Sequence, residues 1–262
     1  MPHDIHIHTS LSACARPDAV LAGYLPLFPV CGVAVAGFSD HLWDGAVPGA
    51  SDWYRPQDVA HVLPLKRELA DAVAPGVKLR FGCELEYVGN GVISLHPDHA
   101  ELFDFVLVSA SHFHMKDFVR PASIDGGPEL EELYYARFMD VCGFDFVTGI
   151  AHPFFPSGFA GREHEVLSLF SERRLETCFR TAQSCGKSIE INLAGLRKLA
   201  AVGVLADYRR IMRIAAGCGC RFHLGSDAHG TCGYGREAFA LGEAFAADCG
   251  IRLPEDPFAT DA

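Results

Sequence analysis

Apolar and polar residues alternate in two different patterns along this chain of 262 residues. Short apolar runs rich in β-branched and aromatic residues are followed by longer stretches in which apolar residues recur every three or four positions. The first pattern is typical of buried strands and the second of amphipathic helices, so their alternation predicts βα units around a parallel sheet. Seven strands are predicted, over residues 4–8, 33–39, 78–83, 105–109, 146–151, 188–191 and 221–225.

The helical pattern occupies most of the intervals between these strands. Helices are predicted over residues 18–28, 56–73, 129–141, 163–184, 205–216 and 236–248, with a short one near 99–102. No internal repeat, low-complexity tract or flexible linker divides the chain, and its length is close to the usual size of an α/β barrel. We therefore expect one barrel domain over residues 1–262.

Composition narrows the class of protein. Hydrophobic residues make up 49% of the chain and charged residues 21%, as in soluble globular proteins. The net charge of -11 argues against nucleic acid as a partner, because its binding normally needs a basic patch. Pro26, Pro29 and Gly32 interrupt the apolar stretch 19–38, which argues against a membrane span. Without a secretory leader pattern, and with ten cysteines but no CxxC pair, a cytoplasmic protein with reduced thiols is expected.

The first predicted strand contains two histidines at alternate positions, His6 and His8. Alternate side chains of a strand point to the same face, so Asp4, His6 and His8 should share one face and Ile5 and Ile7 the other. Neutral imidazole is a common ligand of transition-metal ions. The pattern favours a metal site, and two buried histidines without a metal are the alternative.

Every later strand also ends in residues that can bind metals. These are Asp40 and His41, Glu84 and Glu86, His112 and His114, His152, Glu190 and Asn192, and Asp227 and His229. In a parallel barrel the carboxyl ends of all strands open on the same face, where active sites lie. We therefore expect one multinuclear metal site on that face.

The strand-end segments resemble a known family. His-Ile-His-Thr at 6–9, Asp-His at 40–41, Gly-Cys-Glu at 82–84, Ser-His at 111–112, Ala-His-Pro at 151–153 and Ser-Asp-Ala-His at 226–229 resemble the PHP (polymerase and histidinol phosphatase) superfamily. The resemblance implies a distorted TIM-like (β/α)7 barrel with a multinuclear metal site at the carboxyl ends of its strands. It also implies hydrolysis of phosphate esters by a metal-bridging hydroxide. The segment 190–198 is similar to the part of histidinol-phosphate phosphatases whose arginine, here Arg197, contacts the substrate phosphate.

The resemblance also implies which residues hold the metals. His6, His8, Glu84 and Asp227 would hold a first ion, Glu84 would bridge to a second ion held by His112 and His152, and His41 and His229 would hold a third. Cys14 falls where many members have a histidine that completes the third site, and a small buried cysteine is the alternative for it. Sites rich in histidine suit Zn, Mn or Fe better than Mg or Ca, so two to three such divalent ions are expected.

Other residues have expected supporting roles. Asp4, Asp40 and Glu86 are expected to orient ligand imidazoles by accepting their free ring N–H groups. Either Asp227 or His229 would protonate the leaving oxygen, with Glu84 between the ions as the third catalytic residue. Arg197 would clamp the phosphate and His114 would contact the substrate, the alternatives being an exposed arginine and a surface histidine.

The expected substrate is a small phosphorylated metabolite, with histidinol phosphate favoured. Nucleotide or sugar phosphates, as monoesters or diesters, are alternatives on the same scaffold. A nuclease would use the same metals, but the acidic net charge counts against it. A non-enzymatic metal-binding protein is the alternative of a different class, and neither the metal nor the oligomeric state follows from the sequence.

Overall fold

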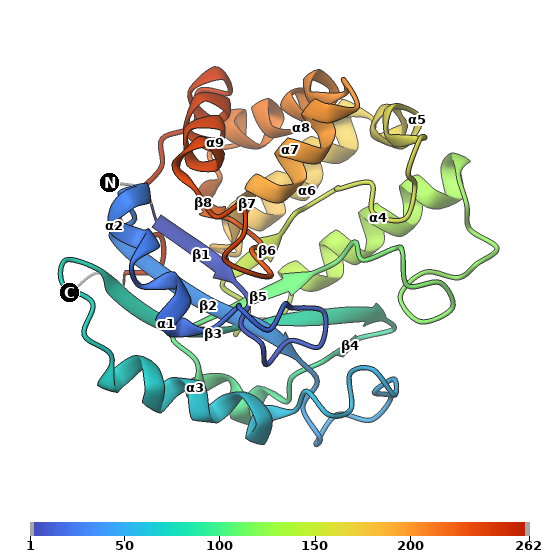
Figure 1. Ribbon diagram of the computed structural model, residues 1–262. Helices are drawn as coiled ribbons and strands as arrows, with labels where there is room; N and C mark the ends of the chain where they lie inside the picture. Colours follow the sequence, from blue (N-terminus) through green and yellow to red (C-terminus); the bar gives the residue numbers. More distant parts are fainter. Residues whose placement is uncertain (1–2, 260–262) are drawn as a thin grey trace.

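The computed structural model describes residues 3–259, which form a barrel of seven parallel strands (Figure 1). The strands follow one another around the barrel in chain order: β1 (His3–Ile7), β2 (Val35–Leu42), β3 (Lys78–Gly89), β5 (Phe105–Ser109), β6 (Gly149–Ala151), β7 (Ser188–Asn192) and β8 (Arg221–Gly225). The ring closes where Ile7 forms a parallel bridge with Ala228 and His8 N–H donates to the Ala228 carbonyl oxygen at 2.9 Å. This confirms the distorted TIM-like barrel of seven strands expected from the sequence.

Helices surround the barrel on its outer side (Figure 1). They are α1 (Leu21–Tyr24), α2 (Leu27–Cys31), α3 (Val59–Asp71), the 3-10 helix η1 (Pro97–Leu102), α4 (Gly127–Cys142), α5 (Glu163–Leu169), α6 (Glu172–Ser184), α7 (Leu193–Ala201), α8 (Leu205–Gly217) and α9 (Arg236–Asp248). Between residues 3 and 259, none of these helices has the length and the apolar character needed to cross a membrane.

Two predicted helices are each divided in the structure. The helix expected over 18–28 is two short helices, because Pro26 lies at the start of α2 and ends the preceding turn. The helix expected over 163–184 breaks after Leu169, where Phe170 is extended and its buried ring packs on Tyr134 and Phe154. Packing of one aromatic side chain therefore overrides a continuous helical pattern.

Two further elements were not predicted. The strand β4 (Val92–Ile93) pairs antiparallel with the end of β3, which runs past the barrel rim. Helix α7 begins directly after β7, where the Asn192 side chain accepts a hydrogen bond from the Gly195 N–H at 2.7 Å. Because Asn192 ends the strand and caps the helix, no loop marks the boundary.

The first strand does not keep the expected alternation of faces. Its register with β2 shifts between Asp4 and Ile7. As a result Ile5 packs in a small inner cluster with Phe105, whereas Ile7 belongs to the large core beneath the helices. The prediction that Ile5 and Ile7 share one face is therefore wrong, and the irregular stretch contains His6 and lies just before His8.

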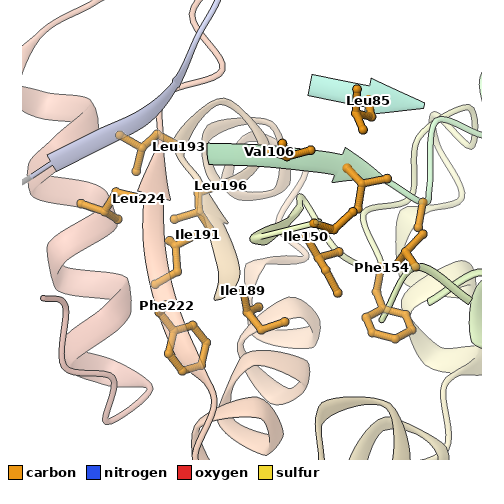
Figure 2. Packing of buried hydrophobic residues seen from close by; sticks show 14 of the residues in the cluster. Leu85, Val106, Ile150, Phe154, Ile189, Ile191, Leu193, Leu196, Phe222 and Leu224 are labelled. Carbon is orange, nitrogen blue, oxygen red and sulfur yellow. The ribbon is translucent and has the colours of Figure 1, made fainter. Parts of the chain in front are cut away.

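The large core lies between the strands and the helices (Figure 2). Ile189 and Ile191 of β7 and Phe222 and Leu224 of β8 are buried there. Burial of aliphatic and aromatic side chains such as these stabilises the fold by roughly 1.5–3 kcal/mol each. This packed layer supports the strands whose carboxyl ends carry the site.

The amino-terminal end of the barrel is closed by aromatic rings. A side chain on Gly82 would lie 2.3 Å from the Phe105 ring, so glycine is required for that ring to fill the barrel interior. Phe258, close to the end of the described residues, stacks on Phe105 with ring centroids 5.4 Å apart. The opposite, carboxyl end of the barrel is left to the polar residues of the site.

Candidate metal centre

Glu84, at the carboxyl end of β3, lies at the centre of a cluster of histidines. Its Oε2 is 3.1 Å from His41 Nδ1 and 3.3 Å from His6 Nε2, and its Oε1 is 3.0 Å from His152 Nε2. His8 and His112 lie at 3.5 and 3.7 Å from the same carboxylate. Glu84 is only 1% exposed, so one buried carboxylate faces five imidazoles that come from the ends of four other strands.

Four groups of three residues bring their ligand atoms within 4.8 Å of one another. The groups are His6, His8 and Asp227; Glu84, His112 and His152; His8, His41 and His229; and His6, His152 and Glu190. The structure therefore brings together eight of the nine residues expected to bind metals. Three of the groups lie at the three expected sites, but the first lacks Glu84, and in the third His8 accompanies His41 and His229 where Cys14 was expected.

The donor set of His6 and His8 fits a bound cation. The two Nε2 atoms face each other at 3.0 Å. The His6 Nδ1–H donates to Glu190, and the His8 Nδ1–H donates to Ser12 Oγ, whose own hydrogen is given to the carboxylate of Asp40. Both Nε2 atoms are then lone-pair acceptors, which repel one another unless a cation or a proton lies between them. A divalent ion beside Glu84 and Asp227 meets this need.

The charges in the cluster shift the pKa values of its members in opposite directions. Burial lowers the pKa of His6, but the carboxylates of Glu190, Glu84 and Asp227 outweigh it and leave the pKa well above its ordinary value. Burial likewise raises the pKa of Glu84, and the neighbouring His6 and His41 outweigh it so that the pKa lies well below its ordinary range. Glu84 is thus an anion, as a bridging ligand must be.

Buried acceptors on the outer side of the cluster fix the ring orientations. Glu86 accepts a hydrogen bond from His112 Nδ1 at 2.7 Å, which is the contact predicted for it. Asp40 acts on His8 only through Ser12. Asp4 accepts the backbone N–H of His6 but does not contact its ring, so the predicted role of Asp4 toward that ring is wrong and Glu190 fills it.

Two residues of the cluster have left-handed backbone conformations. His152 has a φ of 28° and Asp227 a φ of 53°, values that side chains other than glycine seldom adopt. Such conformations cost about 1–3 kcal/mol each and persist where the surrounding structure enforces them, most often at functional sites. Both side chains are thereby turned toward the centre of the cluster.

A cavity of about 620 Å³ opens beside the cluster. Its walls combine residues of the cluster with side chains from the loops after β2, β5 and β6. They are Cys14, His41, Ser51, Trp53, Tyr54, Glu84, His112, His114, Met115, Phe118, His152, Phe155, Ser157, Lys198, Asp227 and His229. The size is within the range of about 300–1,000 Å³ typical of small-molecule sites.

Two further expected site residues, Cys14 and His114, which belong to none of the four groups, also line this cavity. Burial raises the pKa of the Cys14 thiol, but interactions with His229 and His41 outweigh it and bring the pKa to about 6. His114 Nδ1 is 2.8 Å from Ser157 Oγ, and burial together with neighbouring histidines lowers its pKa to about 4. Both side chains are therefore placed where a substrate or an ion would meet them.

The structure separates Arg197 from this cavity. Arg197 lines a smaller cavity of about 200 Å³, which also borders Asp227 and His229. Lys198, the next residue of α7, lines the larger cavity instead. Successive residues of a helix point about 100° apart, which explains how neighbours in sequence reach different cavities.

Sequence reasoning did not single out Glu190 as the partner of His6, or Lys198 as a residue that lines the larger cavity. Glu190 is an acidic residue between two isoleucines of a buried strand, and a buried acid of this kind needs a partner. For Lys198 the sequence carries no such signal, because its direction depends on where α7 begins.

No family model matches the sequence, and no curated protein matches it. Among solved structures, histidinol phosphate phosphatase (HisK) from Lactococcus lactis, in complex with zinc, L-histidinol and phosphate, is similar with a TM-score of 0.63, 17% identity, and coverage of 96% of this chain and 95% of the other. A protein from Listeria monocytogenes, provisionally described as the histidinol phosphatase hisK, has a TM-score of 0.68, 16% identity, and coverage of 91% and 99%. The chain therefore has the fold of these histidinol phosphatase structures, as its resemblance to the PHP superfamily implied.

Proposed function

We propose that the protein is a metal-dependent hydrolase of small phosphate monoesters. The observation that carries this proposal is the position of Glu84, a buried carboxylate that faces five histidines beside a cavity large enough for a small molecule. The fold shared with the histidinol phosphatase structures supports the same conclusion.

The residues that would hold the ions follow the groups described above. His6, His8 and Asp227 would hold one, and His112 and His152 another, with Glu84 between the two. A third would lie between His41 and His229, with His8 or Cys14 completing its ligands. When bound, such ions lower the pKa of water and offset the charge of a phosphoryl group. Zinc, manganese and iron suit this donor set.

Hydrolysis requires one water and a proton transfer. The water oxygen forms a new bond to phosphorus, the bond from phosphorus to the ester oxygen breaks, and the leaving oxygen takes up a proton. Burial raises the pKa of Asp227, but His6 and His8 outweigh it and hold the pKa well below its ordinary range, so Asp227 has no proton to give. We therefore propose His229 as the source of that proton in a centre of two ions, because it borders both cavities and its pKa, which burial lowers, is raised overall by Cys14 and Asp227. Arg197 would hold a phosphate oxygen from the smaller cavity.

Histidinol phosphate is the reference substrate for the test, because the family resemblance points to it and one similar structure holds L-histidinol and phosphate. A nuclease is disfavoured by the net charge of -11. A metal-binding protein without activity would have no use for the cavity beside the cluster.

A phosphate-release assay tests the proposal. Protein loaded with Zn or Mn is incubated with a library of phosphate monoesters, with diesters and with oligonucleotides, and a Glu84→Ala variant serves as the control. Release from monoesters alone, abolished in the variant, is the expected result. Release from oligonucleotides alone would indicate a nuclease, and no release by fully loaded protein would indicate a binding protein.

A further inference from the structure

Away from the metal-centre residues, the charge on the lining of the larger cavity is positive. Within the described residues its acidic lining side chains are Glu84 and Asp227, and both belong to the metal centre. Lys198 is the one lysine or arginine in that lining. Lys198 forms no ion pair with a carboxylate in the part of the chain that the structure describes, and its side chain is exposed at the cavity, so its ammonium group is available to a ligand.

The remaining wall of the cavity is largely apolar and aromatic. Trp53, Met115, Phe118 and Phe155 line it, and they come from three different loops. The Trp53 ring lies edge-on to His41 with centroids 5.4 Å apart, and Phe118 packs on Tyr54, so the wall continues directly from the cluster. A surface of this kind binds flat apolar groups, since aromatic rings favour stacked and edge-on contacts.

We propose that the cavity selects phosphate monoesters whose leaving group combines a flat apolar body with an anionic group, and that Lys198 and this wall are the specificity determinants. The inference rests on the proposed phosphatase function. The phosphate would lie at the metal centre, the flat body against the wall formed by Trp53, Phe118 and Phe155, and the distal anion beside Lys198. The reaction releases the anionic alcohol or phenol and inorganic phosphate.

This selection disfavours cationic leaving groups. The ammonium group of a substrate such as histidinol phosphate would need a carboxylate or a set of acceptors. The two carboxylates of the cavity are engaged by the imidazoles of the cluster, and Lys198 would repel a second cation. The value of kcat/KM should therefore depend on the charge of the leaving group.

Three matched aryl phosphates test the proposal: 4-(carboxymethyl)phenyl, 4-methylphenyl and 4-(aminomethyl)phenyl phosphate. They present an anion, no charge and a cation on similar bodies, with the charge separated from the ring by one carbon. The expected order of kcat/KM is anionic, neutral, cationic, with the anionic ester ahead of the cationic one by roughly threefold to tenfold, as for a solvent-accessible charge pair. The kcat/KM for histidinol phosphate is expected to be close to that for the cationic ester.

Two lysine variants identify the residue responsible. Lys198→Met should bring the ratio of kcat/KM for the anionic and cationic esters close to one, and Lys198→Glu should reverse it. Lys66→Met, on the outer helix α3, is the matched control and should keep the ratio of the wild type. The readout is a ratio within each variant, so a general loss of activity does not alter it.

Each outcome decides the question. A cationic ester or histidinol phosphate as the best substrate overturns the proposal, and so does a ratio unchanged by Lys198→Met, while the hydrolysis itself leaves the proposed function standing. If metal-loaded wild type hydrolyses none of the esters and no other monoester, the proposed function fails and this inference fails with it.

Discussion

Glu190 and Glu84 lie on opposite sides of the His6 ring. Glu190 Oε1 is 2.6 Å from Nδ1, and Glu84 Oε2 is 3.3 Å from Nε2. The other oxygen of Glu190 accepts the backbone N–H of His152. One buried carboxylate thus fixes the tautomer of one candidate ligand and the backbone of another, although it comes from a strand on the far side of the barrel from Glu84.

The first prediction is that Glu190→Gln weakens metal binding by roughly 10–100-fold, the usual effect of removing a residue that orients a ligand histidine. The amide keeps the shape of the side chain but loses the charge that holds the Nδ1–H of His6. Metal affinity can be measured by titration with a competing chelator. Glu176→Gln, at an exposed position of α6, is the control and should bind metal like the wild type. Equal affinities in both variants would contradict the role of Glu190.

The sequence predicted the barrel and the cluster because both depend on local patterns. Each strand is an apolar run, and its end carries the residue that reaches the common face, as His41, Glu84 and His152 show. The parts that it did not predict depend on geometry that no local pattern records. Examples are the shift in β1 that separates Ile5 from Ile7, and the start of α7 at Asn192, which decides that Lys198 rather than Arg197 lines the larger cavity.

The second prediction concerns Cys14, which lines the cavity beside His41 and His229. If its thiolate completes the third metal site, Cys14→Ser should bind one ion fewer than the wild type, because a serine hydroxyl is a poor substitute for a thiolate ligand of zinc. Elemental analysis gives the count. Iodoacetamide should modify Cys14 only after a chelator is added, whereas the exposed Cys185 should react in either state. Equal metal content in wild type and variant would assign the third site to His8, His41 and His229.

The third prediction concerns Arg197. If it holds an oxygen of the phosphate, Arg197→Ala should lower kcat/KM by an amount that corresponds to a loss of about 2–4 kcal/mol of transition-state stabilisation. Metal content should stay unchanged, because Arg197 contributes to none of the ligand groups in the described residues. The exposed Arg173 of α6 offers a control, Arg173→Ala, that should keep full activity. A normal kcat/KM in Arg197→Ala would show that this arginine is only a surface residue.

The last prediction concerns His3 and the stability of the barrel in acid. The fully buried ring of His3 donates from Nδ1 to the Pro254 carbonyl oxygen at 3.0 Å and accepts at Nε2 from the Leu224 N–H at 2.8 Å. The ring is therefore neutral in the folded protein, and it ties the first strand to the last strand and to the carboxyl-terminal segment. Burial lowers its pKa from 6.5 to about 4.

The sign of the effect follows from this shift. Because the folded pKa lies below the unfolded one, the unfolded chain binds the proton first as the pH falls below 6.5. The contribution of His3 to the free energy of unfolding is complete above pH 6.5 and is lost progressively down to pH 4, by about 3 kcal/mol in all.

Urea unfolding in the presence of a chelator, from pH 7.5 to 4.5, measures the loss without the contribution of metals. His3→Gln should be less stable than the wild type at pH 7.5 but should lose less stability on acidification. A profile of His3→Gln parallel to that of the wild type would contradict the neutral, doubly bonded state of the ring.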